Sequence, residues 1–187
     1  MNIEIVSGSP RSNSVTHRVV LYLEKHLKEV TGHDINVIDV RDWEISALQQ
    51  EVFRSVENAP EDLQPLAKRM FAADAFILVT PEYNGSYTPA LKTLFDHFPK
   101  QSRKAFGIVT ASPGALGGMR AALQLQTLIY ALFGIGSPHM LITPMIENKF
   151  DRHGNLTDAS FRKNIDVFIQ EFLWLAEHVT SKTEHLL

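Results

Sequence analysis

The sequence predicts a doubly wound α/β fold, in which helices cover both faces of a parallel sheet. Short apolar runs rich in Ile, Val and Phe alternate along the chain with longer segments whose apolar residues recur every three or four positions. The short runs are typical of strands buried on both faces, and the longer segments of amphipathic helices. Strict alternation of the two requires right-handed crossovers, and therefore a parallel sheet.

Five strands and five helices follow from this pattern. The strands are predicted near residues 2–7, 34–39, 75–80, 104–111 and 136–142. The helices are predicted over Val15–Val30, Pro60–Ala73, Pro89–Phe98, Gly117–Phe133 and Phe161–Val179, and a long irregular segment lies at Val40–Ala59. Five such units are too few for a closed barrel, which needs about 250 residues. We therefore expect one domain over residues 1–187 with an open flavodoxin-like sheet of strand order 2-1-3-4-5.

Composition excludes several classes of function. The 18 basic and 21 acidic residues give a net charge of −3 without long runs of either sign, so we expect neither nucleic acid nor a membrane as a partner. The chain has no cysteine, which excludes disulfides, thiolate nucleophiles and iron–sulfur ligation. The eight histidines show no metal-ligand spacing, so no metal site is expected. A small-molecule partner is favoured.

The first residues indicate a cytoplasmic protein. Met1 leads directly into a predicted strand that contains Glu4, without the basic start and apolar core of a signal peptide. No apolar stretch approaches the length of about 20 residues that a membrane-spanning helix needs.

Three loops are rich in glycine, proline and hydroxyl-bearing residues, and each follows a predicted strand. They are Ser7–Thr16, Thr80–Pro89 and Thr110–Gly118. In an open parallel sheet, ligands bind beyond the carboxyl ends of the strands, where the strand order reverses. We therefore expect the loops after the first, third and fourth strands to form one binding site.

The first of these loops has the chemistry of an anion site. A helix beginning near Ser14 would present unpaired backbone N–H groups and the positive end of its dipole. The loop adds a guanidinium and several hydroxyl donors: Arg11, Ser9, Ser12, Ser14 and Thr16. This set suits a terminal phosphate, although a serine N-cap beside a solvated arginine remains an alternative. The ATP motif G-x-x-x-x-G-K-[ST] and the dinucleotide motif G-x-G-x-x-G are both absent.

The second and third loops are suited to flanking a planar heterocycle. Residues 81–86 place an aromatic ring and an amide beyond a buried strand. Residues 112–118 carry paired glycines at a helix start, where backbone N–H groups can approach a flat ligand closely. Ordinary turn chemistry would explain the glycines of either loop alone.

Four motifs, three of them in these loops, match those of a known family. They are G-S-x-R-x-x-S at residues 8–14, T-P-E-Y-N-x-S at residues 80–86, S-P-G-x-x-G-G at residues 112–118 and F-D-x-x-G-x-L-x-D at residues 150–158. On these motifs the chain resembles the NADPH-dependent FMN reductases, which include flavodoxin-like quinone, chromate and azo-dye reductases. The sequence departs from the common pattern at Thr16, at Ala90 and through Arg41–Glu44.

The resemblance implies FMN as the cofactor and assigns residues to it. The phosphate would be bound by Ser9, Arg11, Ser14, Val15 and Thr16. The isoalloxazine ring would lie near Pro81, Glu82, Tyr83, Asn84 and Ser86, with Ser112, Gly114, Gly117 and Gly118 opposite. Hydride from NADPH or NADH would pass to flavin N5 and then to a small acceptor such as a free flavin, quinone, azo dye or metal oxyanion, by ping-pong turnover.

The chemistry expected of such a protein needs no side-chain nucleophile, because the flavin carries the reaction. The backbone N–H groups of Gly117 and Gly118 are expected to stabilise negative charge that develops on the ring. A flavodoxin-like electron carrier without NAD(P)H activity is the alternative, which the near-neutral net charge disfavours.

The resemblance also implies a homodimer or homotetramer. If the flavin lies at a subunit interface, some apolar residues on the third and fourth helices should exceed what one core can bury. The candidates for this excess are Leu94, Phe95, Leu125 and Leu128.

Overall fold

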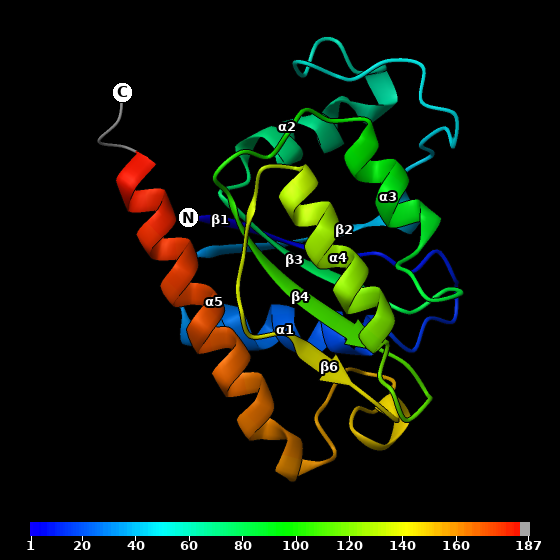
Figure 1. Cartoon of the computed structure of the whole chain (residues 1–187), viewed down its shortest axis with the longest axis vertical. Coiled ribbons are helices and arrows are strands. Elements are labelled where there is room, and N and C mark those ends of the chain that lie inside the picture. The colour runs from blue at the N-terminus through cyan, green and yellow to red at the C-terminus, as the bar shows by residue number, and fades with distance from the viewer. Residues whose placement is uncertain (184–187) are drawn as a thin grey trace.

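A computed structural model describes residues 1–183, and a parallel sheet lies at its centre (Figure 1). The strands lie in the order β2-β1-β3-β4-β5, and a short strand β6 also pairs with β4. All of these pairings are parallel. The strands are β1 (Asn2–Ser7), β2 (Asp34–Asp39), β3 (Ala75–Thr80), β4 (Ala105–Ala111), β5 (Ile135–Gly136) and β6 (Leu141–Thr143). The predicted strand order is confirmed, with one strand more than expected.

Helices cover both faces of this sheet, as predicted (Figure 1). They are α1 (His17–Val30), α2 (Gln64–Ala72), α3 (Pro89–Asp96), α4 (Met119–Ala131) and α5 (Arg162–Thr183). One core cluster joins the sheet to α2, α3 and α4 through side chains such as Leu66, Leu94 and Leu125. The other joins it to α1 and α5 through side chains such as Leu23 and Phe168. β3 and β4 are buried at every residue, which explains their continuous apolar sequences.

The fifth predicted strand is divided into β5 and β6. Gly136 pairs with Phe106 and Leu141 with Val109, so five steps along this segment oppose three along β4. Pro138 lies between the two strands, and proline has no N–H to donate to a β ladder. The single strand expected over residues 136–142 is therefore interrupted at the proline.

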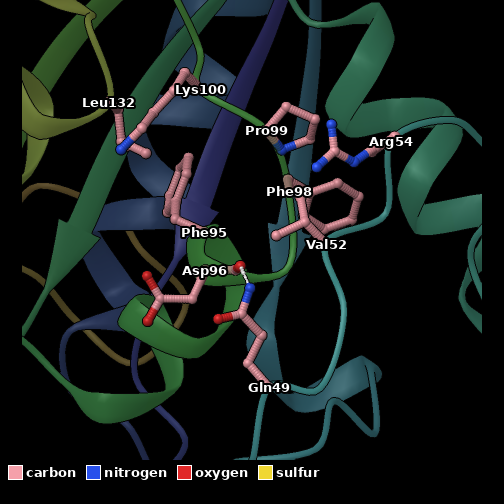
Figure 2. Close-up of a pocket in the computed structure, with 9 residues that line it drawn as sticks. All are labelled: Gln49, Val52, Arg54, Phe95, Asp96, Phe98, Pro99, Lys100 and Leu132. Carbon is pink, nitrogen blue, oxygen red and sulfur yellow. Dashed lines mark hydrogen bonds between the residues drawn. The ribbon is translucent and has the colours of Figure 1, made fainter.

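The irregular segment between β2 and α2 packs over the carboxyl end of α3. Phe53 is buried there, its N–H donates to the carbonyl of His97 at 2.8 Å, and its ring meets Phe98 edge-on at 5.6 Å. A cavity of about 520 Å³ lies between this segment and α3. Figure 2 shows the residues that line it, with the Gln49 side chain donating to the backbone carbonyl of Asp96. This cavity shares no residue with the three loops singled out in the sequence.

The apolar residues expected to require a second subunit are instead buried within the chain. Leu94, Phe95, Leu125 and Leu128 belong to the core cluster formed with α2, α3 and α4, and the most exposed of them, Leu128, is 6% exposed. The prediction that they exceed one core was wrong, because the sheet is wide enough for α3 and α4 to bury all four side chains against it.

Large apolar side chains are nevertheless exposed on and around α4. They include Met119, Leu123, Tyr130 and Phe133, of which Tyr130 is 73% exposed. No helix within residues 1–183 is long and apolar enough to cross a membrane.

Candidate active site at the carboxyl edge of the sheet

The three loops meet at the edge of the sheet where the strand order reverses. β1 lies between β2 and β3, so the chain crosses from one side of β1 to the other between its second and third strands. Ser7 is in register with Val79, and Thr80 with Thr110, so the loops leave adjacent strands at the same level. A cavity of about 230 Å³ opens between them and is lined by all three.

Most of the residues predicted to hold a flavin line this cavity. They are Ser9, Arg11, Ser14, Val15, Thr16, Pro81, Glu82, Tyr83 and Ser112. Asn84, Ser86, Gly114, Gly117 and Gly118 were also predicted but are not part of the lining. Asn13, Ala111 and Pro113 line the cavity without having been predicted, although Asn13 and Pro113 stand inside the motifs.

The first loop keeps free donors immediately before α1. The N–H of His17 donates to the Ser14 hydroxyl at 3.3 Å, and the N–H groups of Arg18 and Val19 donate to the carbonyls of Val15 and Thr16. These N–H groups of the first turn are therefore satisfied within the chain, although the N-cap residue itself is Thr16 and its side chain makes no capping hydrogen bond. Within residues 1–183, no hydrogen bond is recorded from the N–H of Val15 or Thr16. The free amides thus lie in the loop itself, because α1 begins later than the sequence predicted.

Arg11 supplies a positive charge beside these amides. Its guanidinium carbon lies 4.9 Å from the centroid of the Tyr83 ring, in a cation–π contact. No carboxylate in the described part of the chain forms a salt bridge with it. The charge of Arg11 is therefore available to an anion in the cavity.

The second loop makes a tight turn and reaches toward α4. Tyr83 and Ser86 exchange backbone hydrogen bonds of 2.8 and 3.1 Å around Asn84 and Gly85, both of which have positive φ. This turn points its two central residues away from the ladder and explains why Asn84 is not part of the lining. The Glu82 carboxylate forms an ion pair with Arg120 of α4, which links the second loop to the helix that follows the third.

The third loop needs glycine at two positions. Gly117 and Gly118 have φ of +61° and +86°, and an added Cβ would lie 2.7 Å from the Pro144 nitrogen and 2.9 Å from Thr110 Cβ respectively. The loop therefore packs directly against β4 and the end of β6. The N–H of Gly117 donates to the carbonyl of Gly114 at 3.3 Å and is already engaged. From the N–H of Gly118 no hydrogen bond is recorded within residues 1–183.

A polar network lies beneath the first loop, and nothing in the sequence pattern indicates it. Ser7 and Asp39 end neighbouring strands in register, and His17 Nδ1 lies 3.2 Å from the Ser7 hydroxyl and 3.3 Å from the Asp39 carboxylate. Asp39 also accepts hydrogen bonds of 2.8 and 2.6 Å from the Arg41 guanidinium. The register of β1 against β2 aligns Ser7 with Asp39, and the start of α1 brings His17 to both.

Burial and the charge of Arg41 shift the pKa values of Asp39 and His17 in this network. Burial alone would raise the pKa of Asp39, but hydrogen bonds from the side chain and backbone of Arg41 outweigh it and lower that pKa. Burial, followed by the nearby Arg41 charge, lowers the pKa of His17 below 6.5 in spite of Asp39. His17 is therefore neutral at neutral pH, and Asp39 is ionised.

Comparisons with known proteins agree with this site. A curated relative, the FMN-dependent NADPH-azoreductase of Staphylococcus aureus, is 28% identical over 190 residues, covering 97% of each chain. The structure of the flavoenzyme NAD(P)H:(acceptor) oxidoreductase FerB from Paracoccus denitrificans superposes with a TM-score of 0.78 at 22% identity, covering 95% of this chain and 97% of FerB. An oxidoreductase from Corynebacterium diphtheriae superposes with a TM-score of 0.68 at 15% identity, again covering 95% and 97% of the two chains.

These two structures share the fold of this chain, and a family profile shows the family to which the chain belongs. The profile described as NADPH-dependent FMN reductase matches residues 1–147, which contain β1 to β6 and all three loops. The chain therefore belongs to the NADPH-dependent FMN reductase family, whose members are oxidoreductases that use FMN and NADPH.

Proposed function

We propose that the cavity at the carboxyl edge of the sheet binds FMN, and that the enzyme uses it to pass hydride from NADPH to a small acceptor. The convergence of three loops from adjacent strands on one cavity, with unpaired amides and a free guanidinium at one end, carries this proposal. FMN has a dianionic phosphate and a planar ring, and the cavity offers a matching group for each.

The first loop is proposed to hold the phosphate. The N–H groups of Val15 and Thr16 and the hydroxyl of Ser9 stand beside the Arg11 guanidinium. Arg11 must then leave its contact with the Tyr83 ring. An exposed cation–π contact is worth about 0.5–1 kcal/mol, whereas a hydrogen bond to a charged group is worth about 1.5–3 kcal/mol. The bond of Arg11 to the phosphate is therefore more stable than its contact with Tyr83, and the movement of Arg11 would uncover one face of the Tyr83 ring.

The second and third loops are proposed to enclose the ring. Tyr83 would form a wall on one side, with Pro81 and the Glu82–Arg120 ion pair beside it. Ser112, at the start of the glycine-rich turn, also lines the cavity and would face the ring. The N–H of Gly118 precedes α4, where the positive end of the helix dipole would favour negative charge developing during reduction. Gly117 is not proposed for this role, since its N–H is engaged.

Bound FMN would accept hydride from NADPH and deliver it to the acceptor, while the protein positions both partners. One cavity serves both half-reactions, so NADP⁺ must leave before the acceptor enters, and turnover would be ping-pong. We propose acceptors that are flat or compact: free flavin, quinone, azo dye or metal oxyanion. Use of NADPH supports a cytoplasmic location.

An anaerobic titration tests the proposed function. The purified protein, loaded with FMN, should lose its visible flavin absorbance within seconds of NADPH addition, and a quinone should restore it. A yellow protein that neither NADPH nor NADH bleaches would refute the proposal in favour of the electron-carrier alternative.

We also propose a homodimer that forms through α4. Leu123 and Tyr130 stand seven residues apart on this helix and are 50% and 73% exposed, so they share one face. Self-association would bury this face, and a two-fold dimer would pair it with its copy. Sedimentation should detect a dimer at micromolar concentration, which Tyr130→Glu should dissociate. A flavin-bound monomer for the unaltered protein would contradict the proposal.

A further inference from the structure

A second cavity lies on the other side of the first loop. Its volume is about 440 Å³, and it shares Asn13, Ser14 and Val15 with the proposed flavin cavity. Its remaining walls come from the start of α1, from Arg41 after β2 and from Arg152 in the loop before α5. One loop therefore separates two cavities, and each has an arginine-bearing wall.

Three guanidiniums from distant parts of the chain line this second cavity. Arg41 is fixed by Asp39 and by the Ser12 carbonyl, to which it donates at 3.2 Å. Arg18 donates to the carbonyl of Phe150 at 3.0 Å. Both arginines are thereby held in place with some N–H groups left over, because a guanidinium carries five.

Arg152 differs from the other two arginines. It is exposed, and within residues 1–183 no hydrogen bond, ion pair or ring contact is recorded for its side chain. Because the Arg152 guanidinium has no recorded interaction within these residues, it is available to bind a ligand.

Carboxylates lie beside two of the three arginines of this cavity. Arg18 lies 3.6 Å from the Glu147 carboxylate, which is 56% exposed, and Asp39 is committed to Arg41. Asp42 also acts on Arg41, so Arg152 is the arginine of this cavity for which no carboxylate partner is recorded within residues 1–183. A ligand with a compact double negative charge would complete the site.

We propose that this cavity binds the 2′-phosphate of NADPH, and that Arg152 selects NADPH over NADH. This inference rests on the proposed function, in which NADPH donates hydride in the neighbouring cavity. The terminal phosphate of FMN is assigned to the Arg11 side of the loop, so a second phosphate site requires a second phosphorylated ligand. NADPH is that ligand, and its 2′-phosphate is the group that NADH lacks. The two cavities have Asn13, Ser14 and Val15 in common. One dinucleotide lying across this loop would therefore reach both of them.

Steady-state kinetics of the FMN-loaded enzyme test the selection. Arg152→Gln should lower kcat/KM for NADPH by about tenfold, as expected for loss of one charge-assisted hydrogen bond at an exposed position, and that for NADH by less than about twofold. Arg152→Lys should recover part of the loss, because it restores the charge without the fork. Arg103→Gln makes the same charge change before β4, at the opposite edge of the sheet, and should alter neither value.

Calorimetry with adenosine 2′,5′-bisphosphate tests the site without any turnover. This probe should bind the unaltered protein, and Arg152→Gln should weaken it about tenfold, while 5′-AMP should bind weakly and equally to both proteins. Because the measurement needs no reduction of flavin, it stands even if the proposed enzyme activity fails. Equal binding of the two adenosine phosphates, or displacement of the bisphosphate by equimolar inorganic phosphate, would overturn the assignment. An equal effect of Arg152→Gln on NADPH and NADH would do the same.

Discussion

Replacing Gly117 with alanine should damage the flavin site from within the fold. Gly117 has φ of +61°, and an alanine Cβ there would lie 2.7 Å from the Pro144 nitrogen and 2.8 Å from Ile142 Cγ2. The left-handed conformation costs alanine about 1–2 kcal/mol. Overpacking against another segment adds about 1–3 kcal/mol, and the backbone nitrogen of Pro144 cannot rotate away as a flexible side chain would. Together the two effects predict a loss of stability of about 2–5 kcal/mol.

Gly114→Ala is the matched control for this substitution. The nearest atom to its added Cβ would be the Ser112 hydroxyl at 3.6 Å, an ordinary contact, and its φ is not in the left-handed range. Its stability should be unchanged or higher by up to about 1 kcal/mol, since alanine restricts the unfolded chain.

Thermal unfolding of the two variants separates these expectations. For a domain of this size, 1 kcal/mol corresponds to about 2–4 °C in Tm, so Gly117→Ala should unfold about 4–20 °C below the unaltered protein. The variant should also bind FMN more weakly, because the added methyl group would push the third loop away from β6 and Pro144. Equal Tm values for the two alanine variants would refute the close packing of this loop.

Two further predictions concern pH. Burial lowers the pKa of Lys104 from 10.5 to about 8, so the unfolded chain binds more protons than the folded one between these values, and stability should rise with pH across that range. The rise, at most about 3 kcal/mol, should disappear in Lys104→Met when urea unfolding is followed at both ends of the range. Burial and Arg41 also lower the pKa of His17, so stability should fall as pH drops below 6.5, and the fall should be smaller in His17→Asn.

Much of the fold could be predicted because the apolar pattern and the chirality of crossovers act locally. Runs such as Ala75–Thr80 are buried on both faces and leave little choice of structure. The division of the last strand at Pro138 follows from the lost N–H donor, and the proline was visible in the sequence. The burial of Leu125 and Leu128 could not be judged from helical period alone, because it depends on how wide a sheet α4 covers.

The candidate site was only partly predictable for a related reason. Loop composition identified residues such as Ser9 and Tyr83, since glycine- and hydroxyl-rich turns are local features. The contact of His17 with Asp39 depends on how the start of α1 packs beside the end of β2, and the second cavity depends on Arg152 returning to α1 from the far end of the chain. Contacts of this kind have no local pattern.

The position of the phosphate is the most direct test of the proposed flavin site. Arg11 is the positively charged side chain of the first loop, and it lines the cavity. Arg11→Gln should therefore weaken FMN binding by about tenfold to a hundredfold. Riboflavin lacks the phosphate and should bind the unaltered protein more weakly than FMN, with almost no change in the variant. Flavin fluorescence titrations of both proteins with both ligands, at fixed ionic strength, give the four affinities. A selective loss of FMN affinity is the predicted result, whereas equal affinities for the two flavins, or an equal effect of Arg11→Gln on both, would contradict a phosphate site in this loop.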